Sequence, residues 1–203
     1  MIRRRKSRLR PARLFFVLLT LAALAACWVK YHGAVLDAVE ACLCAKPPGI
    51  ILHHSASAPR AGGRVIDAAA LDRMHARRGF MTWYRGKAYH IGYHFVILQD
   101  GTVQRGRPVG CRGSHTHGRA IYNRYIGICL VGDFSSRDNP NGARGPVRPT
   151  TAQMDALTHL CRRLMREYGI TAEKVKRHRD FNQTECPGDR FPYDRLIAKL
   201  RRP

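Results

Sequence analysis

Two histidines and one cysteine, far apart in the sequence, are residue types that could together hold a metal ion. His178 and Cys186 are separated by one short loop, and Pro187-Gly188 supplies a turn that fixes the approach of the sulfur. An imidazole and a thiolate placed in this way can bind one zinc ion. His53 is the third candidate, because it ends an apolar run in which a bare imidazole needs a partner.

This donor set is typical of a catalytic rather than a structural metal site. Three protein ligands of nitrogen and sulfur type leave one position of a tetrahedral zinc ion open, whereas structural sites usually close with four. Three further histidines are candidates for a fourth ligand, and we interpret them as substrate-facing or structural. They are His54, His115 and His117.

Four short apolar runs predict the strands that must position these residues. They are Ile50–Leu52, Tyr93–Leu98, Ile126–Val131 and a run that starts at Val175. The first would deliver His53 and His54 at its C-terminal end, and the last would deliver His178. The Asp100-Gly101 pair predicts a tight hairpin turn after the second strand.

Two amphipathic segments predict helices between the strands. Residues 66–78 keep helical spacing up to Gly79, and Thr150 begins a capping box followed by a second helical pattern that Gly169 stops. Strands interspersed with such helices predict one α/β domain with a central mixed sheet flanked by helices.

The N-terminus has the pattern of an export signal or membrane anchor, which we assign to residues 1–29. Seven cations precede the apolar run Leu14–Ala26 without an acidic residue, as in Sec-type signals. Leu24-Ala25-Ala26-Cys27 resembles a lipobox, in which Cys27 would be lipidated. An uncleaved anchor is the alternative, since Leu14–Val29 is close to the lower limit of about 17 residues for a span.

Residues 30–48 are predicted to be a tether, and Pro47-Pro48-Gly49 marks the boundary of the main domain, over 49–203. The chain has seven cysteines, so at least one has a role other than a disulfide. Cys129 and Cys161 lie in apolar patterns and are predicted to be buried thiols. The sequence leaves the disulfide pattern of Cys42, Cys44 and Cys111 open.

The formal charge of +22, from 36 Lys and Arg against 14 Asp and Glu, predicts anionic partners. The basic residues are scattered and carry neither aromatic interleaving nor a nucleic-acid fingerprint, which argues against nucleic acid. Anionic wall polymers or lipid headgroups explain the surplus better.

Six motifs, in this order, resemble the type 2 N-acetylmuramoyl-L-alanine amidase family, which includes phage zinc amidase-type lysozymes and animal peptidoglycan recognition proteins. They are Ile51-Leu-His-His-Ser55, Gly92-Tyr-His-Phe-Val-Ile97, Asp100-Gly-Thr-Val103, Gly113-Ser-His115, Ile126-Gly-Ile-Cys-Leu-Val-Gly132 and Thr184-Glu-Cys-Pro-Gly188. The resemblance runs from about Gly49 to the last helix. It implies a mixed α/β fold.

The resemblance places the family's zinc ligands on His53, His178 and Cys186, and its catalytic tyrosine on Tyr93. Thr184 stands where phage members carry a lysine, which weakens the case for a cationic oxyanion stabiliser there. The family's ligand-facing segment matches four residues of the loop before the third strand, and we add His54 to these as a substrate contact. The four are Ser114, His115, Arg119 and Asn123.

The function that the resemblance implies is zinc-dependent cleavage of the amide between N-acetylmuramic acid and L-alanine in peptidoglycan. With the N-terminal segment, we expect a monomer that is exported to the periplasmic side of a bacterial envelope and stays membrane-associated. Zinc would lower the pKa of a water molecule toward ~7 and polarise the carbonyl, while Tyr93 and Thr184 would offer hydrogen bonds. Two alternatives remain. One is a peptidoglycan-binding protein without activity, and the other is a hydrolase with Cys186 as nucleophile and His178 as base.

Overall fold

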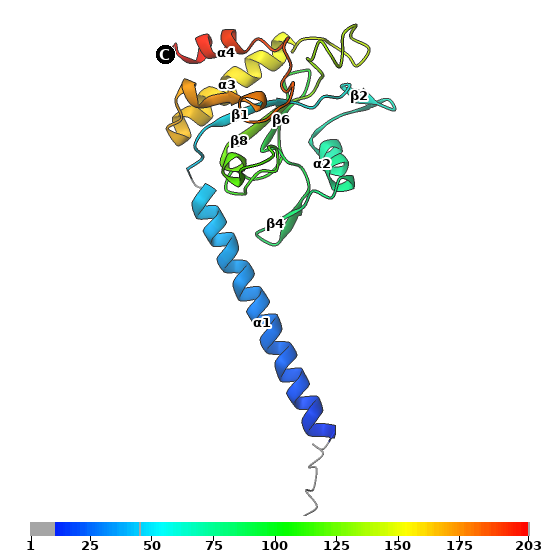
Figure 1. Cartoon of the computed structure of the whole chain (residues 1–203), viewed down its shortest axis with the longest axis vertical. Coiled ribbons are helices and arrows are strands. Elements are labelled where there is room, and N and C mark those ends of the chain that lie inside the picture. The colour runs from blue at the N-terminus through cyan, green and yellow to red at the C-terminus, as the bar shows by residue number, and fades with distance from the viewer. Residues whose placement is uncertain (1–10, 45, 203) are drawn as a thin grey trace, which may run out of the picture. The chain divides into compact units, whose positions relative to one another are not determined.

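The computed structural model describes residues 11–44 and 46–202 (Figure 1). The chain divides into two compact units, with the boundary between Val39 and Glu40. Most of helix α1 (Pro11–Cys44) belongs to the first unit, and the sheet and the other helices form the second. The basic residues 3–10 of the expected targeting segment lie outside the described residues.

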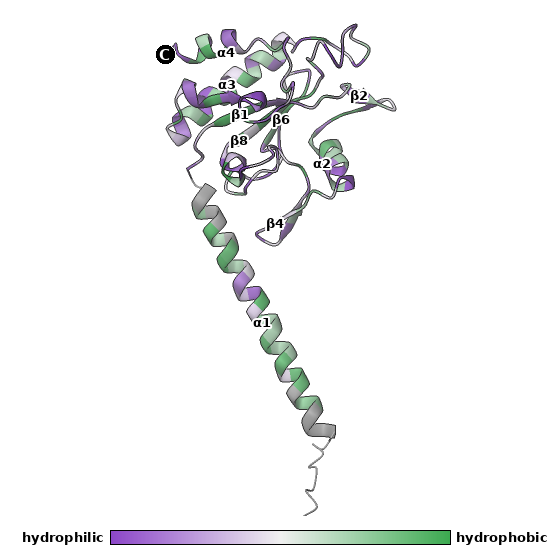
Figure 2. Cartoon of the chain, in the orientation of Figure 1, coloured by the Kyte–Doolittle hydropathy of each residue, from purple (hydrophilic) through white to green (hydrophobic). Residues whose placement is uncertain are grey.

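Helix α1 contains one stretch that is long and apolar enough to cross a membrane. Leu18–Leu36 has a mean hydropathy of 1.4 over 19 residues, and none of it is buried (Figure 2). At 1.5 Å per residue it is about 28 Å long, close to the hydrocarbon thickness of a bilayer. A signal sequence meets the same criteria. The segment expected to be a tether is helical as far as Cys44.

A five-stranded mixed sheet forms the centre of the second unit, as expected. In spatial order its strands are β7 (Val103–Arg105), β6 (Phe95–Ile97), β8 (Ile126–Leu130), β1 (Ile50–His54) and β9 (Val175–Arg177). β7 pairs antiparallel with β6, and the other neighbours are parallel. The fully buried runs of β1 and β8 occupy the middle, as is usual for strands covered on both faces.

Helices cover both faces of this sheet (Figure 1). α3 (Thr151–Tyr168) and α4 (Tyr193–Leu200) pack on the face that carries Ile50 and Leu52. α2 (Ala68–Arg77) packs on the opposite face, with Val96 and Cys129. Successive residues of a strand point to opposite faces. Therefore β1 sends His53 toward the α2 side and His54 toward the α3 side.

The start of α3 is fixed by the capping box that the sequence predicts. The Thr150 hydroxyl oxygen accepts a hydrogen bond from Gln153 N at 3.0 Å, and Thr150 N donates to Gln153 Oε1 at 3.1 Å. The same hydroxyl donates to the Gln99 carbonyl at 2.7 Å. Gly169 ends the helix in the left-handed region, with φ of 65°.

We expect Thr150→Ala to lower the free energy of unfolding by about 1–2 kcal/mol, because it removes the cap and leaves Gln153 N without its partner. Thr151→Ala is the matched control, since Thr151 is exposed at the first helical position. Chemical denaturation of the full chain in a mild detergent measures both. Equal destabilisation by the two variants would contradict the capping role.

Two short hairpins and three 3-10 turns lie outside the elements that the sequence predicts. The hairpins are β2 (Arg60–Ala61) with β3 (Arg64–Val65) and β4 (Thr82–Tyr84) with β5 (Lys87–Tyr89). The turns are η1 (Ala120–Arg124), η2 (Ala172–Lys174) and η3 (His178–Asp180). Cys129 and Cys161 are buried free thiols, as expected, and Cys42 and Cys111 are free as well.

Candidate metal centre and active site

The three expected metal ligands meet at the C-terminal end of β1. His53 is the fourth residue of that strand, His178 opens η3 directly after the neighbouring strand β9, and Cys186 lies in the following loop. One ligand atom from each lies within 4.8 Å of the others. The side chains come from segments more than 120 residues apart, so the parallel pairing of β1 with β9 creates the cluster.

The spacing of the His53 and Cys186 donor atoms fits a zinc ion. Nδ1 of His53 lies 3.6 Å from Sγ of Cys186. A tetrahedral zinc with bonds of about 2.05 Å to nitrogen and 2.3 Å to sulfur holds those two atoms about 3.6 Å apart. Both residues are buried, which keeps competing water away.

A chain of hydrogen bonds fixes which nitrogen of His53 can bind metal. Nε2 of His115 lies 3.1 Å from the Tyr125 carbonyl, which can only accept, so that nitrogen carries the proton. Nδ1 of a neutral His115 is then an acceptor, and it lies 3.0 Å from Nε2 of His53. His53 therefore donates from Nε2 and keeps its Nδ1 lone pair toward Cys186. Burial, together with the neighbouring His115, lowers the pKa of His53 well below its usual value and favours this neutral form.

Asn182 fixes which ring nitrogen of His178 carries the proton. Its Nδ2 donates to the His117 carbonyl at 2.9 Å, and its Oδ1 accepts from His117 N at 3.1 Å, so the orientation of the amide is set. That Oδ1 also lies 2.9 Å from Nε2 of His178 and must accept from it. Nδ1 of His178 is then the nitrogen with a free lone pair. Partners of this kind fix the tautomer of a ligating histidine and strengthen its binding.

We expect Asn182→Ala to weaken zinc affinity by about 10- to 100-fold, because His178 loses the acceptor that fixes its tautomer. Gln183→Ala is the control, since Gln183 is the exposed neighbour in the same loop. Competition with a chromogenic chelator measures the affinity, and circular dichroism checks that both variants fold. An unchanged affinity in a folded Asn182→Ala protein would remove the positioning role.

Cys186 is held by backbone contacts on both sides. Its sulfur accepts from His54 N at 3.4 Å, and its own N–H donates to the Thr184 hydroxyl at 3.3 Å. Burial raises the pKa of the Cys186 thiol to about 12 in the absence of a metal. A divalent ion beside the sulfur would reverse this shift, since a coordinating thiol is deprotonated. The environment therefore suits a metal ligand.

Tyr93 stands over the metal ligands. Its ring centroid lies 5.2 Å from that of His53 and 6.4 Å from that of His115. Burial, followed by the nearby thiols of Cys129 and Cys186, raises the pKa of Tyr93 well above its usual value. A phenol is protonated at neutral pH even at its usual pKa of about 10, so Tyr93 can act as a hydrogen-bond donor.

Comparison with known proteins agrees with this geometry. The N-acetylmuramoyl-L-alanine amidase family Amidase_2 matches residues 44–189, which is most of the chain and includes all three expected metal ligands. The chain belongs to this family.

Among the proteins that the chain resembles, the endolysin of Klebsiella phage KP32 is 36% identical over 112 residues, which is 54% of this chain and 68% of the endolysin. The endolysin of Escherichia phage T7 is 30% identical over 139 residues, covering 68% of this chain and 78% of that protein. The solved amidase LysC of Clostridium intestinale is 37% identical with a TM-score of 0.59, covering 76% of this chain and 85% of LysC. Bovine peptidoglycan recognition protein 1 is 34% identical over 99 residues, 49% of this chain and 47% of its own length.

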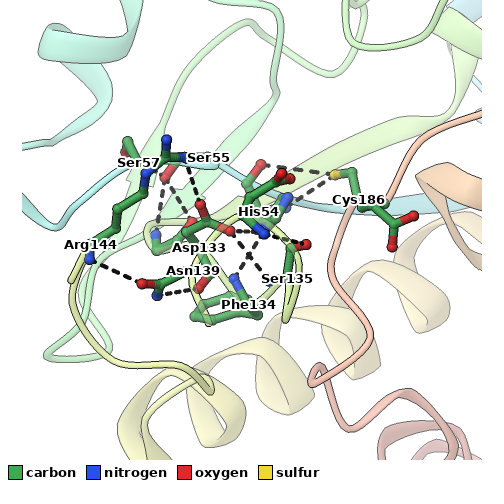
Figure 3. A network of polar contacts seen from close by, with 12 residues as sticks. His54, Ser55, Ser57, Asp133, Phe134, Ser135, Asn139, Arg144 and Cys186 are labelled. Carbon is green, nitrogen blue, oxygen red and sulfur yellow. Dashed lines mark hydrogen bonds and ion pairs between the residues drawn. The ribbon is translucent and has the colours of Figure 1, made fainter. Parts of the chain in front are cut away.

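The side chain of His54, which was expected at the substrate, lies in a polar network on the α3 side of the sheet, and the backbone of His54 links this network to Cys186 (Figure 3). It is 5% exposed, and its Nδ1 accepts from Phe134 N at 3.1 Å. Burial lowers the pKa of His54 to about 4, so its 3.7 Å contact with Asp133 is not an ion pair near neutral pH. The buried Asp133 carboxylate instead pairs with Arg144 at 3.1 Å. This network anchors the loop after β8.

The other residues assigned to substrate divide into two groups. His115 is buried with both ring nitrogens engaged, and the Asn123 carboxamide is used by backbone atoms of residues 115 and 116. These two therefore shape the loop and support His53. Ser114 is half-buried and Arg119 exposed on that loop, so they keep the position expected of substrate contacts.

The sequence analysis missed Asn182 and the supporting role of His115. Asn182 could have been found from its position four residues after His178, because a short turn at that spacing brings the Asn182 amide back to the His178 imidazole. No comparable local signal existed for His115, because its partners His53 and Tyr125 come from two different strand ends.

Proposed function

We propose that this chain hydrolyses the amide between N-acetylmuramic acid and L-alanine in peptidoglycan, with one zinc ion held by His53, His178 and Cys186. The convergence of two orientation-fixed imidazoles and one thiol within 4.8 Å carries the proposal. Membership of the amidase family and the 37% identity to LysC support the same reaction class.

A zinc ion at these ligands would supply Lewis acidity toward the scissile carbonyl and a lowered pKa for a nucleophilic water. The chain's own residues prepare the site. His115 and Asn182 hold the lone pairs of His53 and His178 in place. The Tyr93 phenol donates a hydrogen bond to the oxygen that becomes negative as the amide is attacked, which lowers the barrier most if the donor is fixed in advance.

Thr184 takes a positioning role in this proposal. Its hydroxyl accepts from Cys186 N and thereby orders the turn that carries the sulfur ligand. A threonine side chain has no charge, so oxyanion stabilisation by the chain's own groups rests on Tyr93.

A thiol nucleophile is the less favoured alternative. Nucleophilic cysteines have lowered pKa values and a histidine base beside the sulfur. Burial raises the pKa of the Cys186 thiol to about 12, which is the opposite of the shift that a nucleophilic cysteine needs. A role in recognition without catalysis is disfavoured because all three donors are present.

We also propose that the N-terminal segment attaches the enzyme to a bacterial envelope membrane, either as a lipoprotein through Cys27 or as an uncleaved anchor through α1. The catalytic unit would then lie on the periplasmic side, and we propose that it acts as a monomer. The apolar stretch Leu18–Leu36 supports membrane attachment. The basic character of the chain, at +22, favours attraction to the anionic envelope.

Mass analysis of purified muropeptides incubated with the full chain tests the reaction. We expect intact stem peptide to be released from muramic acid, the activity to be lost after chelation, and zinc to restore it. A thiol hydrolase would withstand the chelator. Absence of cleavage in the zinc-loaded protein would refute the enzymatic proposal.

A further inference from the structure

A cleft of about 460 Å³ at the far edge of the sheet gathers positive charge away from the metal centre. It lies between the edge strand β7 and helix α3. Four basic side chains line it, and they are Arg105, His159, Arg163 and Arg166. The floor is apolar and includes Phe95, Val103 and Leu160.

The helix and the strand place these groups on one surface by regular geometry. His159, Arg163 and Arg166 are spaced i, i+4 and i+7, so they share one face of α3. Arg105 ends β7 and supplies the opposite wall. The three arginines are exposed and in reach of a ligand from solvent.

No carboxylate in the described part of the chain lines the cleft. Among the described residues, Arg105, Arg163 and Arg166 make no ion pair with an acidic side chain. Both acidic residues of α3 lie outside the lining. Of these, Asp155 pairs with Lys199 at 3.8 Å instead. Glu167, the other acidic residue of α3, is hydrogen-bonded to Tyr168. Three guanidinium groups that line one cleft repel one another, and an anion bound among them would relieve this repulsion.

We infer that this cleft is an exosite that binds a phosphoryl anion. Guanidinium groups bind phosphate oxygens in bidentate geometry, and several arginines on two walls suit one phosphate better than scattered lysines would. Such a group could come from an anionic lipid headgroup or from a free phosphate. The cleft lies on the α3 side of the sheet, whereas His53 faces the α2 side, so the two sites can be occupied together.

Pyrophosphate binding to the full chain in uncharged detergent, followed by calorimetry, tests the inference. The cleft variant is Arg163→Gln with Arg166→Gln. The control is Arg64→Gln with Arg148→Gln, which removes the same net charge from exposed positions outside the cleft lining. We expect at least about a tenfold loss of affinity in the first variant and less than about twofold in the second.

Vesicles distinguish the source of the phosphate. Sedimentation with phosphatidylcholine vesicles, with and without one quarter phosphatidylglycerol, isolates the headgroup contribution from insertion of α1. If only the cleft variant loses the extra sedimentation that phosphatidylglycerol causes, the ligand of the cleft is a lipid headgroup. If the cleft variant loses pyrophosphate binding but keeps that extra sedimentation, the ligand is a free phosphate. Equal behaviour of the two double variants with both probes would overturn the site. None of these measurements depends on amidase activity, so they can fail independently of it.

Discussion

Cys186→Ser is expected to lose stoichiometric zinc and to reduce muropeptide hydrolysis by at least about 10³-fold, because a neutral hydroxyl replaces the one anionic ligand. The serine keeps the size of the side chain and its contact with His54 N, so the fold should survive. Metal analysis by mass spectrometry and muropeptide cleavage measure the two losses. Cys161→Ala is the control, since it removes a fully buried thiol from the α3 core, away from the metal ligands.

Cobalt substitution separates loss of a ligand from loss of a nucleophile. A thiolate bound to Co²⁺ gives a charge-transfer band in the near ultraviolet, which should be present in the wild type and in Cys161→Ala and absent in Cys186→Ser. Cys186→Asp offers a carboxylate that zinc also accepts, so partial recovery of metal binding is expected. An inactive Cys186→Ser protein that still binds zinc with wild-type affinity would show that the sulfur is not a ligand.

Much of this fold could be predicted because its strands and helices carry strong local patterns. The continuous apolar runs of β1 and β8 indicate strands buried on both faces, and Thr150 and Gly169 mark the ends of α3 by their capping chemistry. His53 and His178 could be proposed as ligands because His53 lies near the end of one predicted strand and His178 follows another. Parallel neighbouring strands bring their ends together, so the residues that follow them meet.

The network around the ligands could not be predicted in the same way. His115 reaches His53 across 62 residues, and Asn182 is fixed by the backbone of residue 117, 65 residues away. Such contacts depend on how two loops pack and leave no periodic trace in the sequence. His54 shows the same limit, because its neighbours Asp133 and Phe134 are contributed by the loop after β8. A histidine pair at a strand end gives no sign of which member faces which layer.

The second large effect is expected for Tyr93→Phe, which should lower kcat by about 10²- to 10³-fold, the usual cost of removing one oxyanion donor. The phenyl ring can keep the packing of Tyr93 against His53 and His75, at ring separations of 5.2 and 5.5 Å. The metal ligands are untouched, so zinc content should remain at one ion per chain. KM should change little, because the donor acts mainly on charge that develops in the transition state.

Tyr168→Phe is the matched control for the loss of a phenolic hydroxyl, since Tyr168 ends α3 and packs at the edge of its core. It should leave kcat and zinc content at wild-type values. Steady-state kinetics on a defined muropeptide, with zinc measured on the same preparations, distinguishes the possible roles of Tyr93. A fall in zinc content would make it a support for the ligands, and a rise in KM at constant kcat would make it a substrate contact. A loss confined to kcat requires a hydroxyl that acts when the amide carbonyl becomes an oxyanion. The phenol of Tyr93, whose ring lies 5.2 Å from that of the expected ligand His53, is placed to donate that hydrogen bond.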